Sequence, residues 1–522
     1  MQIPAIFSTE FDIEKIQREP SPSTSVETAK AHDEPQQARV NSSACLHQLS
    51  GEDYLVTFKP GDEEDPQNWS RKKKYGVTLA LSATAFNRIM ISTIMAPGIT
   101  TISEELNMTT TESTMALSVY ILATAFGPLI LGPLSEVYGR KPLVHGINIW
   151  LLVWNLICGF AHSKGLLIAA RLIAGLGGSA VFTLGYGVLS DIWHADERGR
   201  TMSLYLLIPL TGTAVGPIIG GFIIQYTTWR WMFWATTTSH IIIELCSITI
   251  IQETYAPLLL LKRACKLRQQ TGNPRYHTKF SAYTANRSAL WTLRQSLTRP
   301  LRLLAFHPII QIQALCSGLS YGLLYFALSS YSTLYTTVYH EPVAISGLHY
   351  IAICAGEVLG ALLCGPLMDY LYRVLKQKAG GEARPEHRVP MLLPSLLITP
   401  VGLLLYGWAT QRRLYWLVVD VGVALLCLGM QVFGMIIQAY IMDSYPDHVS
   451  SASAASQLLK GLLAFAFPLF ADRLYRTLGY GWGNSLLALV SLGITLPSAF
   501  VLWRYGARLR GKMLTSYYRN LG

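Results

Sequence analysis

The sequence is poor in charged residues. Only 14% of its 522 residues are Asp, Glu, Lys or Arg, whereas a soluble globular chain carries roughly 25%. Hydrophobic residues make up 51% of the chain, and the mean hydropathy is +0.32. This balance argues against a large soluble enzyme and favours a protein that crosses a membrane several times.

Motifs for metal binding and for ATP hydrolysis are missing as well. The eight cysteines are spread along the chain without a CxxC pair or a Cys/His cluster, so we expect neither a disulfide scaffold nor a metal site. The chain has no HExxH element, and the lack of a Walker loop argues against primary ATP-driven transport. We therefore expect no enzymatic activity, no cofactor and no metal.

The distribution of basic residues argues against a nucleic-acid partner. The net charge is +11, although residues 1–70 carry 13 Asp/Glu and only 5 Lys/Arg. The basic residues of the remaining chain fall in short loops between apolar segments, which is typical of membrane topology rather than of a phosphate-binding face.

The first 70 residues predict a disordered cytoplasmic tail, because they are rich in Ser, Pro, Glu and Asp and have no sustained apolar period. They contain no basic segment followed by an apolar one, so we expect no cleaved signal peptide, and the first membrane helix then acts as the signal anchor.

From residue 75 onward, apolar segments recur at the length of roughly 20 residues that a helix needs to cross a membrane. They form two sets of six: 75–97, 115–135, 143–162, 166–190, 203–224 and 231–252, then 308–330, 344–368, 390–410, 415–440, 452–472 and 483–504. We predict an all-α polytopic membrane protein of two six-helix bundles related by a pseudo-twofold axis. Its expected parts are the tail 1–70, a first bundle 71–253, a basic central loop 254–306, a second bundle 307–505 and a C-terminal tail 506–522.

The loop charges predict the orientation. Alternate loops are basic, as at Arg140 and Lys141, whereas loop 98–114 has three Glu and no Lys or Arg. Both termini are therefore expected in the cytoplasm. The plasma membrane is the expected location, and the vacuolar membrane is the alternative. The segment 262–305 has ten Lys/Arg and no acid, so we expect it to lie along anionic lipid. Asn107 is then an external glycosylation sequon.

An internal repeat supports the division into two halves. Each half has Gly-Pro-Leu, one further residue, an acid, and a base four residues after the acid. Two parallel halves of this kind, with a substrate site between them, are typical of secondary transporters. We interpret the charges as a conformational latch with Asp191 as the partner of Arg140; the alternative is a set of positive-inside determinants on a solvated turn. The latch residues are Gly132, Glu136, Gly139, Arg140, Lys141, Asp191, Asp369 and Arg373.

From Tyr54 to Arg510 the chain resembles the major facilitator superfamily, and more narrowly the fungal twelve-span drug:proton antiporters, which include multidrug, mycotoxin and polyamine exporters. The order and spacing of several elements carry the resemblance: Asp65–Ser70, Gly132–Lys141, Arg171–Gly175, Gly212–Gly221, Trp229–Trp231, Glu253–Pro257, Pro385–Arg388 and Gly479–Trp482. Ala174, the pair Asn87-Arg88 and Asp420 depart from the family pattern.

The resemblance implies a major facilitator fold and an antiporter-like element in the fifth helix. Its small residues allow close helix approach, and its proline weakens the backbone ladder enough for a bend. We interpret the element as a tightly packed seam that seals against leak; simple small-residue packing is the alternative. The element comprises Gly212, Gly216, Pro217, Gly220 and Gly221.

Buried charges and aromatic faces predict the pathway. A charge inside a helix costs a few kcal/mol and marks a route for substrate or protons, so Arg171 is expected to serve transport, the alternative being a structural arginine bonded to the first or fifth helix. Glu357, beside Gly356 and Gly360, is our candidate for the buried acid that proton coupling requires. Asp420 and Lys460 are expected to reach water near helix ends. Further lining candidates share helix faces, although ordinary packing is the alternative for each: Phe182, Tyr186, Tyr321, Tyr325, Gln431 and Gln438.

The sequence therefore predicts a secondary active transporter that exports small organic molecules by proton antiport through alternating access. Its expected partners are a small-molecule substrate, protons and membrane lipid, with no nucleic acid, and the expected state is a monomer. The alternatives are a facilitator or proton symporter that imports a nutrient, and a non-transporting membrane sensor of the same fold.

Overall fold

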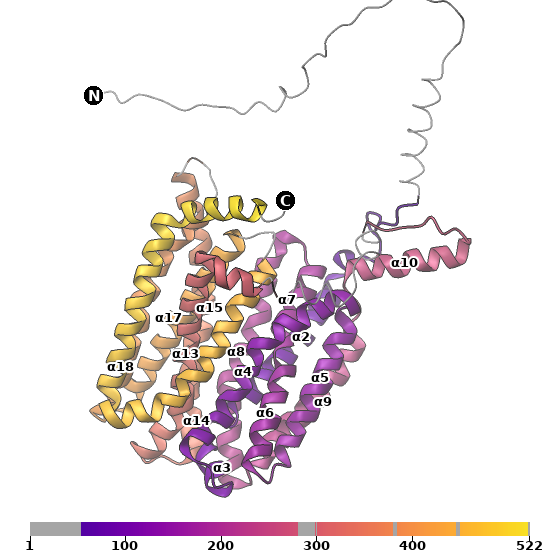
Figure 1. Ribbon diagram of the computed structural model, residues 1–522. Coiled ribbons are helices and arrows are strands. Elements are labelled where there is room, and N and C mark those ends of the chain that lie inside the picture. The colour runs from indigo at the N-terminus through magenta and orange to yellow at the C-terminus, as the bar shows by residue number, and fades with distance from the viewer. Residues whose placement is uncertain are drawn as a thin grey trace, which may run out of the picture. The chain divides into compact units, whose positions relative to one another are not determined.

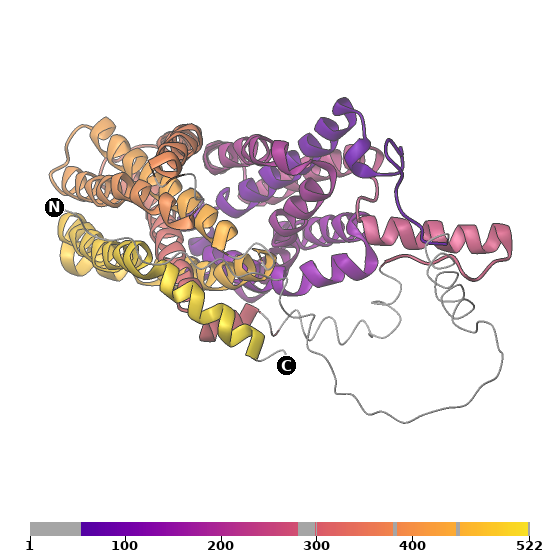
Figure 2. The same ribbon diagram turned by 90° about the horizontal axis from the view of Figure 1, so that it is seen from above.

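Long helices packed side by side make up the protein (Figure 1). The computed structural model describes residues 54–279, 298, 300–378, 380, 384–444 and 449–519. The first set comprises α2 (Arg71–Thr93), α4 (Thr110–Tyr138), α5 (Arg140–Gly159), α6 (Lys164–Gly178) with α7 (Ala180–Ile192), α8 (Ala195–Tyr226) and α9 (Arg230–Ile250). The second set comprises α13 (Pro308–Thr337), α15 (Tyr350–Lys378), α16 (Leu392–Gln411), α17 (Trp416–Ser444) and α18 (Val449–Arg519). Short elements connect them: η2 (Pro66–Asn68), α3 (Ile99–Glu105), α10 (Ala256–Thr271), α14 (Val343–Leu348) and η3 (Pro385–Met391). Figure 2, a view from above, shows the two sets as neighbouring bundles.

Nine segments of the described chain are long and apolar enough to cross a membrane. The last of them, Ala452–Arg510, contains two rods, because Gly479 has a φ of +74° and interrupts α18. Two further long helices, α2 and α9, are not among the nine, because polar or charged residues in the middle of each lower its hydropathy. The result is the predicted all-helical fold with two sets of six spans.

Local signals in the sequence explain where the helices begin and end. Ser70 accepts a hydrogen bond from the backbone N–H of Lys73 and caps α2, while Thr109 and Glu112 form a reciprocal capping box at the start of α4. Gly139, with a φ of +97°, is the single residue between α4 and α5. Glycine populates this conformation without steric cost, so the two helices can follow each other directly.

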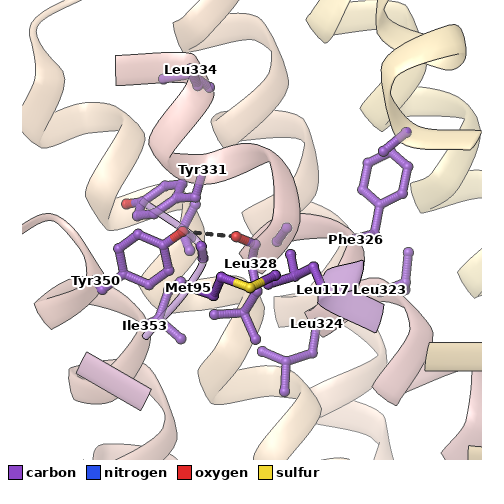
Figure 3. Packing of buried hydrophobic residues seen from close by; sticks show 14 of the residues in the cluster. Met95, Leu117, Leu323, Leu324, Phe326, Leu328, Tyr331, Leu334, Tyr350 and Ile353 are labelled. Carbon is purple, nitrogen blue, oxygen red and sulfur yellow. Dashed lines mark hydrogen bonds between the residues drawn. The ribbon is translucent and has the colours of Figure 1, made fainter. Parts of the chain in front are cut away.

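The largest buried apolar cluster joins the two bundles. It combines Met95 and Leu117 of the first set with Leu323, Phe326 and other residues of the second. Figure 3 shows these residues around the hydrogen bond that the Tyr350 hydroxyl donates to the Leu328 carbonyl at 2.8 Å. Many large apolar side chains, among them Leu363, Leu397 and Leu489, are exposed on the outside, as expected for helices that face lipid. Polar and charged side chains buried along the seam between the bundles are therefore the candidates for a functional role.

The two ends of the helix bundle differ. Both α3 and α14 lie at one end, which we name the α14 end (Figure 1). The labels of α7 and α10 lie toward the opposite end (Figure 1), which we name the Asp191 end after an acid in the last turn of α7.

Residues 56–64, part of the segment expected to be disordered, pack against α10, whereas Trp69 packs against the cluster that contains α7. The backbone N–H of Val56 donates to the carbonyl of His277 at 2.8 Å, and Arg263 of α10 forms an ion pair with Asp62. The hydrogen bond from Arg263 holds the pKa of the Asp62 carboxyl below its usual value. The ion pair is therefore formed at neutral pH and weakens only as acid protonates the carboxylate. The acidic tail and the basic central loop thus meet through complementary charge.

Candidate functional site

A buried acid and the antiporter-like helix meet at the seam between the bundles. Glu357 of α15 is 5% exposed, and its Oε2 accepts a hydrogen bond from the Thr213 hydroxyl of α8 at 3.0 Å. Thr213 directly follows Gly212 in the element that the sequence singles out. The structure thus brings the candidate proton carrier of the second bundle into contact with the first bundle.

A cation surrounded by tyrosines lies along the same seam. Arg88 of α2 is buried and interacts electrostatically with Tyr120 of α4, Tyr205 of α8, and Tyr321 and Tyr325 of α13. The rings of Tyr321 and Tyr325 lie 5.4 Å apart. The sequence marked Arg88 as an ionisable residue inside the membrane and as a departure from the family pattern, but nothing in it indicates which helices that side chain faces.

Two predicted lining residues lie near each other within this group. Tyr321 is within electrostatic range of Glu357 and of Tyr186 of α7. Lys460 of α18 was expected to reach water, yet its Nζ lies 5.7 Å from the centroid of the Tyr321 ring. Aromatic faces, a carboxylate and two cations therefore share a region bounded by both bundles. The side chain of Phe182 lies outside those that the structure describes.

The two glutamines of α17 have different surroundings. Gln431 packs against Gly360, where an added methyl group would lie 3.0 Å from the Gln431 Cβ. Gln438 donates a hydrogen bond to the Ser453 hydroxyl of α18 at 2.9 Å. Gln431 therefore stands beside the helix that carries Glu357, whereas Gln438 joins two helices of the second bundle.

Arg171 of α6 is fully buried, and its donors point to backbone carbonyls. Nη1 donates to Ile91 at 2.9 Å, Nη2 to Ser92 at 3.4 Å, and Nε to Ala116 at 3.4 Å. Ile91 and Ser92 are in the last turn of α2, where carbonyls have no donor within the helix. The guanidinium also lies 4.7 Å from the centroid of the Tyr120 ring. These contacts tie the end of α2 to α6 and α4.

The glycines of α8 allow close contact with α2. A methyl group added at Gly212 would lie 2.9 Å from the Phe86 carbonyl oxygen, and one at Gly216 would lie 3.0 Å from that of Met90. One at Gly220 would collide with the carbonyl of Ile94. Larger side chains at these positions would push α8 away from α2, which explains the run of small residues.

Beyond these glycines, α8 contacts α14 across the seam. A methyl group at Gly221 would lie 2.9 Å from the Val343 carbonyl oxygen, and one at Gly347 would lie 2.6 Å from that of Pro217. The side chain of Gln225 accepts a hydrogen bond from the backbone N–H of Ala344 at 3.1 Å. In this conformation the two bundles are in close contact at the α14 end.

Arg140 and Asp191 form an ion pair at the opposite end. Arg140 Nε lies 3.2 Å from Asp191 Oδ2, and Thr254 donates to the same oxygen at 3.2 Å. Glu253 accepts from the backbone N–H groups of Arg140 at 3.0 Å and Lys141 at 3.3 Å. A carboxylate at this position satisfies donors at the start of α5 and complements the helix dipole.

The second bundle has its own ion pairs at this end. Arg388 Nε lies 2.6 Å from Asp443 Oδ2, and Arg510 binds both carboxylate oxygens of Glu386 at 2.7 and 2.8 Å. The sequence did not predict these pairs. The available signal was that the fourth helix of each half has an acid near its end, Asp191 in the first half and Asp443 in the second.

Other predicted latch residues have less defined roles. Gly132 packs against Thr183, and Arg373 is exposed near the end of α15. The side chains of Glu136 and Asp369 lie outside those that the structure describes. The sequon residue Asn107 is exposed in the turn between α3 and α4, with a φ of +50°.

Asp420 was expected to reach water, and this is a correction. It is 8% exposed, and its Oδ1 accepts hydrogen bonds from the hydroxyls of Tyr331 and Tyr335, both at 2.6 Å. Its Oδ2 lies 2.9 Å from Nδ1 of His349, whose Nε2 lies 2.8 Å from Glu341. A carboxylate with three partners from other helices is held in place rather than extended to solvent. The spacing of the two tyrosines, four residues apart on one helix face, was the available signal.

A second buried acid, Glu244 of α9, bonds to another helix. His240 lies one turn before it on the same helix face. The Glu244 carboxylate instead lies 2.6 Å from Nδ1 of His145 and accepts from Asn148 at 2.7 Å, both on α5. The interhelical partners are better placed than the residue one turn away.

Two bundles of membrane-spanning helices, with charges and tyrosines buried along their shared seam, define a multi-pass membrane transporter. Comparison with known families agrees: the model described as "Major Facilitator Superfamily" matches residues 79–468. The chain belongs to this superfamily. Membership makes it a transporter of small molecules rather than an enzyme.

Fungal relatives match over most of their length. The Aspergillus flavus protein named "Probable efflux pump mfs2" is 63% identical over 81% of this chain and 100% of its own length. The Penicillium aethiopicum protein named "Efflux pump vrtL" is 37% identical over 87% of this chain and 90% of its own.

Solved structures share the fold at low sequence identity. The proton:xylose symporter XylE superposes with a TM-score of 0.60 at 13% identity, over 84% of this chain and 96% of its own. The human organic anion transporter MFSD10 gives a TM-score of 0.57 at 16% identity, over 82% and 99% of the two chains.

Proposed function

We propose that the protein exports small organic molecules, such as drugs or secondary metabolites, by proton antiport through alternating access. The observation that carries this proposal is the contact between Glu357 and Thr213, because it places a buried acid against the antiporter-like helix. Two fungal relatives are named as efflux pumps, which supports the direction of transport.

The proposed coupling works through the charge on Glu357. The ionised carboxylate accepts the hydrogen bond from Thr213 and holds α15 against α8. A proton neutralises that acceptor and weakens the contact, so proton binding and movement of the two bundles become linked. Tyr186, Tyr321 and Tyr325 offer aromatic faces with hydroxyl groups, which suit amphipathic compounds.

Alternating access requires contacts that form at one end and break at the other. We assign the Asp191 end to the cytoplasm and the α14 end to the outside, with both termini cytoplasmic and the plasma membrane as location. The contact between α8 and α14 then acts as the outer seal. The ion pairs of Arg140 and Arg388 each lie within one bundle, so as the inner latch they fix the helix ends at the cytoplasmic face rather than join the two bundles. The protein works as a monomer, and Asn107 on the outer side is open to glycosylation.

The proton dependence of export tests the proposal. Cells that overproduce the protein should accumulate less of some compound in a panel of toxic metabolites and drugs than cells that lack it. In inside-out vesicles, uptake of that compound should fall to background when a protonophore collapses the pH gradient at clamped membrane potential. Uptake that persists without the gradient would refute antiport. Higher accumulation in overproducing cells would favour the nutrient importer, and equal accumulation across the panel would favour the sensor.

The orientation has a separate test. Cys265 on α10 is exposed, and on the proposed topology it faces the cytoplasm. A membrane-impermeant maleimide should therefore leave Cys265 unmodified in intact cells and modify it after permeabilisation. Thr110→Cys, at the start of α4, should add a site that reacts in intact cells. Modification of Cys265 in intact cells would reverse the assignment of the two ends.

A further inference from the structure

A cavity on the second bundle opens near the α14 end. Its volume is about 560 Å³, and most of the residues that line it are apolar. Ile351 and Leu417 on its rim are exposed apolar side chains, so this part of the rim faces lipid. Three ionisable side chains also line it: Glu341, His349 and Asp420.

These three side chains form one hydrogen-bonded chain, which we name the acid–histidine triad. His349 lies between the two acids, with Nε2 at 2.8 Å from Glu341 and Nδ1 at 2.9 Å from Asp420. An imidazolium donates from both ring nitrogens, whereas neutral imidazole donates from only one and presents a lone pair at the other. Both contacts are therefore hydrogen bonds to ionised carboxylates only when His349 carries a proton.

The groups around the triad hold it in one geometry. Tyr335 of α13 stacks on the imidazole with 3.6 Å between ring centroids. Tyr331, also on α13, donates a hydrogen bond to Asp420 of α17. Tyr350 of α15 lies 5.3 Å from the Tyr331 ring (Figure 3). Other tyrosines that interact with the triad or its neighbours are Tyr339, after α13, and Tyr406 of α16.

Besides histidine, the triad contains only acids, and the other ionisable groups facing it are tyrosines. Within the described ranges, no group of three or more His, Cys, Asp and Glu residues could hold a metal ion. The proton is therefore the ligand that this geometry fits.

The triad is joined to the helix that closes the α14 end. His349 directly follows α14 and is its C-cap, while Asp420 belongs to α17 of the same bundle. Two residues before His349, Gly347 packs against the Pro217 carbonyl of α8. The hydrogen bonds of His349 thus anchor the segment that contacts the first bundle.

We propose that the acid–histidine triad is a proton-binding site that couples protonation at the α14 end to closure of α14 against α8. A proton from water at the partly exposed Glu341 binds the ring nitrogen of His349 that carries no hydrogen and completes both hydrogen bonds to the carboxylates. Loss of that proton to water opens one of them and releases the anchor of α14. This inference rests on the proposed antiport, because it gives protons at the outer face a role in closing the outer seal.

Proton binding can be read from an indole beside the histidine. Trp416 lies 5.3 Å from the His349 ring in an edge-to-face arrangement, and a protonated imidazole quenches a neighbouring indole more than a neutral one. The full chain in lipid nanodiscs should show a one-proton fluorescence transition as the pH is varied. The Trp416→Phe variant, subtracted as the background of the other tryptophans, isolates this signal. The transition should vanish in His349→Gln.

A matched control separates the triad from histidine titration in general. His340 is exposed and has a φ of +57°, a conformation that asparagine tolerates. His340→Asn should therefore keep the transition. A titration that is the same in His349→Gln as in the unmodified chain would overturn the proposal. If His349→Gln does not fold, Glu341→Gln provides the second test, because it removes one charged acceptor and should shift the transition.

Closure of the seal has its own measurement. The backbone N–H of Ala344 lies 3.1 Å from the Gln225 side chain, so Gln225→Cys with Ala344→Cys reports closure by disulfide formation. Relative to the same cysteine pair in a His349→Gln background, cross-linking should gain at least about threefold when pH falls from about 8 to about 5.5. This ratio cancels the general effect of pH on thiol reactivity. The same pH profile in both backgrounds would refute the coupling.

The two experiments need neither substrate nor a pH gradient. Failure of the proposed antiport would be seen as export that ignores the gradient, whatever the triad does. Failure of this inference would be seen as cross-linking with the same pH profile in the His349→Gln background, in a protein whose export still follows the gradient.

Discussion

Glu357→Gln is expected to abolish export driven by a proton gradient while leaving the protein folded in the membrane. Glutamine has nearly the shape of glutamate, and its side-chain oxygen can still accept the hydrogen bond from Thr213. It cannot ionise, so it neither takes up nor releases a proton. Gradient-driven transport should fall at least about tenfold.

The measurement compares two transport modes in proteoliposomes. Uptake driven by a pH gradient should be lost in Glu357→Gln, whereas exchange of labelled for unlabelled substrate without a gradient should continue. Exchange needs the bundles to move but needs no net proton transfer. Surface abundance, measured in parallel, shows that the variant is present.

Two variants provide controls for this result. Glu244→Gln removes another buried acid, one that bonds His145 and Asn148 within the first bundle, and it should keep the response to the gradient. Thr213→Val removes the hydrogen bond but keeps the acid, so coupling should be altered rather than lost. A normal gradient response in Glu357→Gln would exclude Glu357 as the proton carrier and make Asp420 the next candidate.

The sequence was sufficient for the fold because its signals are local. Apolar runs of span length and the repeated Gly-Pro-Leu elements predict two sets of six helices without knowledge of any contact. Even α2 and α9, whose polar residues lower their hydropathy, were predicted from the apolar segments 75–97 and 231–252. Helix caps and single glycines such as Gly139 and Gly479 depend on neighbouring residues only.

The site was predictable only in part, because helical periodicity does not reveal how a helix is rotated about its axis. Glu357 was predicted as the buried acid because it is a charged residue beside Gly356 and Gly360 within an apolar segment. The partners of Asp420 come from α13 and from the residue after α14, and those of Arg388 and Glu386 from α17 and α18. Such pairs join residues far apart in sequence, so they need the packed structure to be recognised.

The role of Arg171 was also left open by the sequence, because its hydrogen-bond partners lie on other helices. The sequence predicted a guanidinium for substrate or protons, with a structural arginine as the alternative. The three hydrogen bonds to carbonyls of α2 and α4 favour the alternative. Two of those carbonyls lie in the last turn of α2, where the helix dipole also favours a cation.

Arg171→Ala is therefore expected to destabilise the protein, and transport should fall with the amount of folded protein. The substitution leaves up to three buried carbonyls without their donors, at a cost of about 1–3 kcal/mol for each unsatisfied group. The melting temperature in detergent should drop by roughly 5 °C or more. Arg171→Lys should give an intermediate loss, because one ammonium group cannot reproduce the planar fork of donors.

The control for this experiment is an arginine on the surface. Arg476 of α18 is largely exposed and pairs with Asp472 one turn away, and such pairs contribute at most about 1 kcal/mol. Arg476→Ala should therefore keep the melting temperature and surface abundance of the unmodified chain. Dividing transport by surface abundance then separates the two roles of Arg171. If Arg171→Ala reaches the surface in normal amounts, melts normally and still fails to transport, the guanidinium acts directly on substrate or protons, and its hydrogen bonds to α2 and α4 must open during the transport cycle.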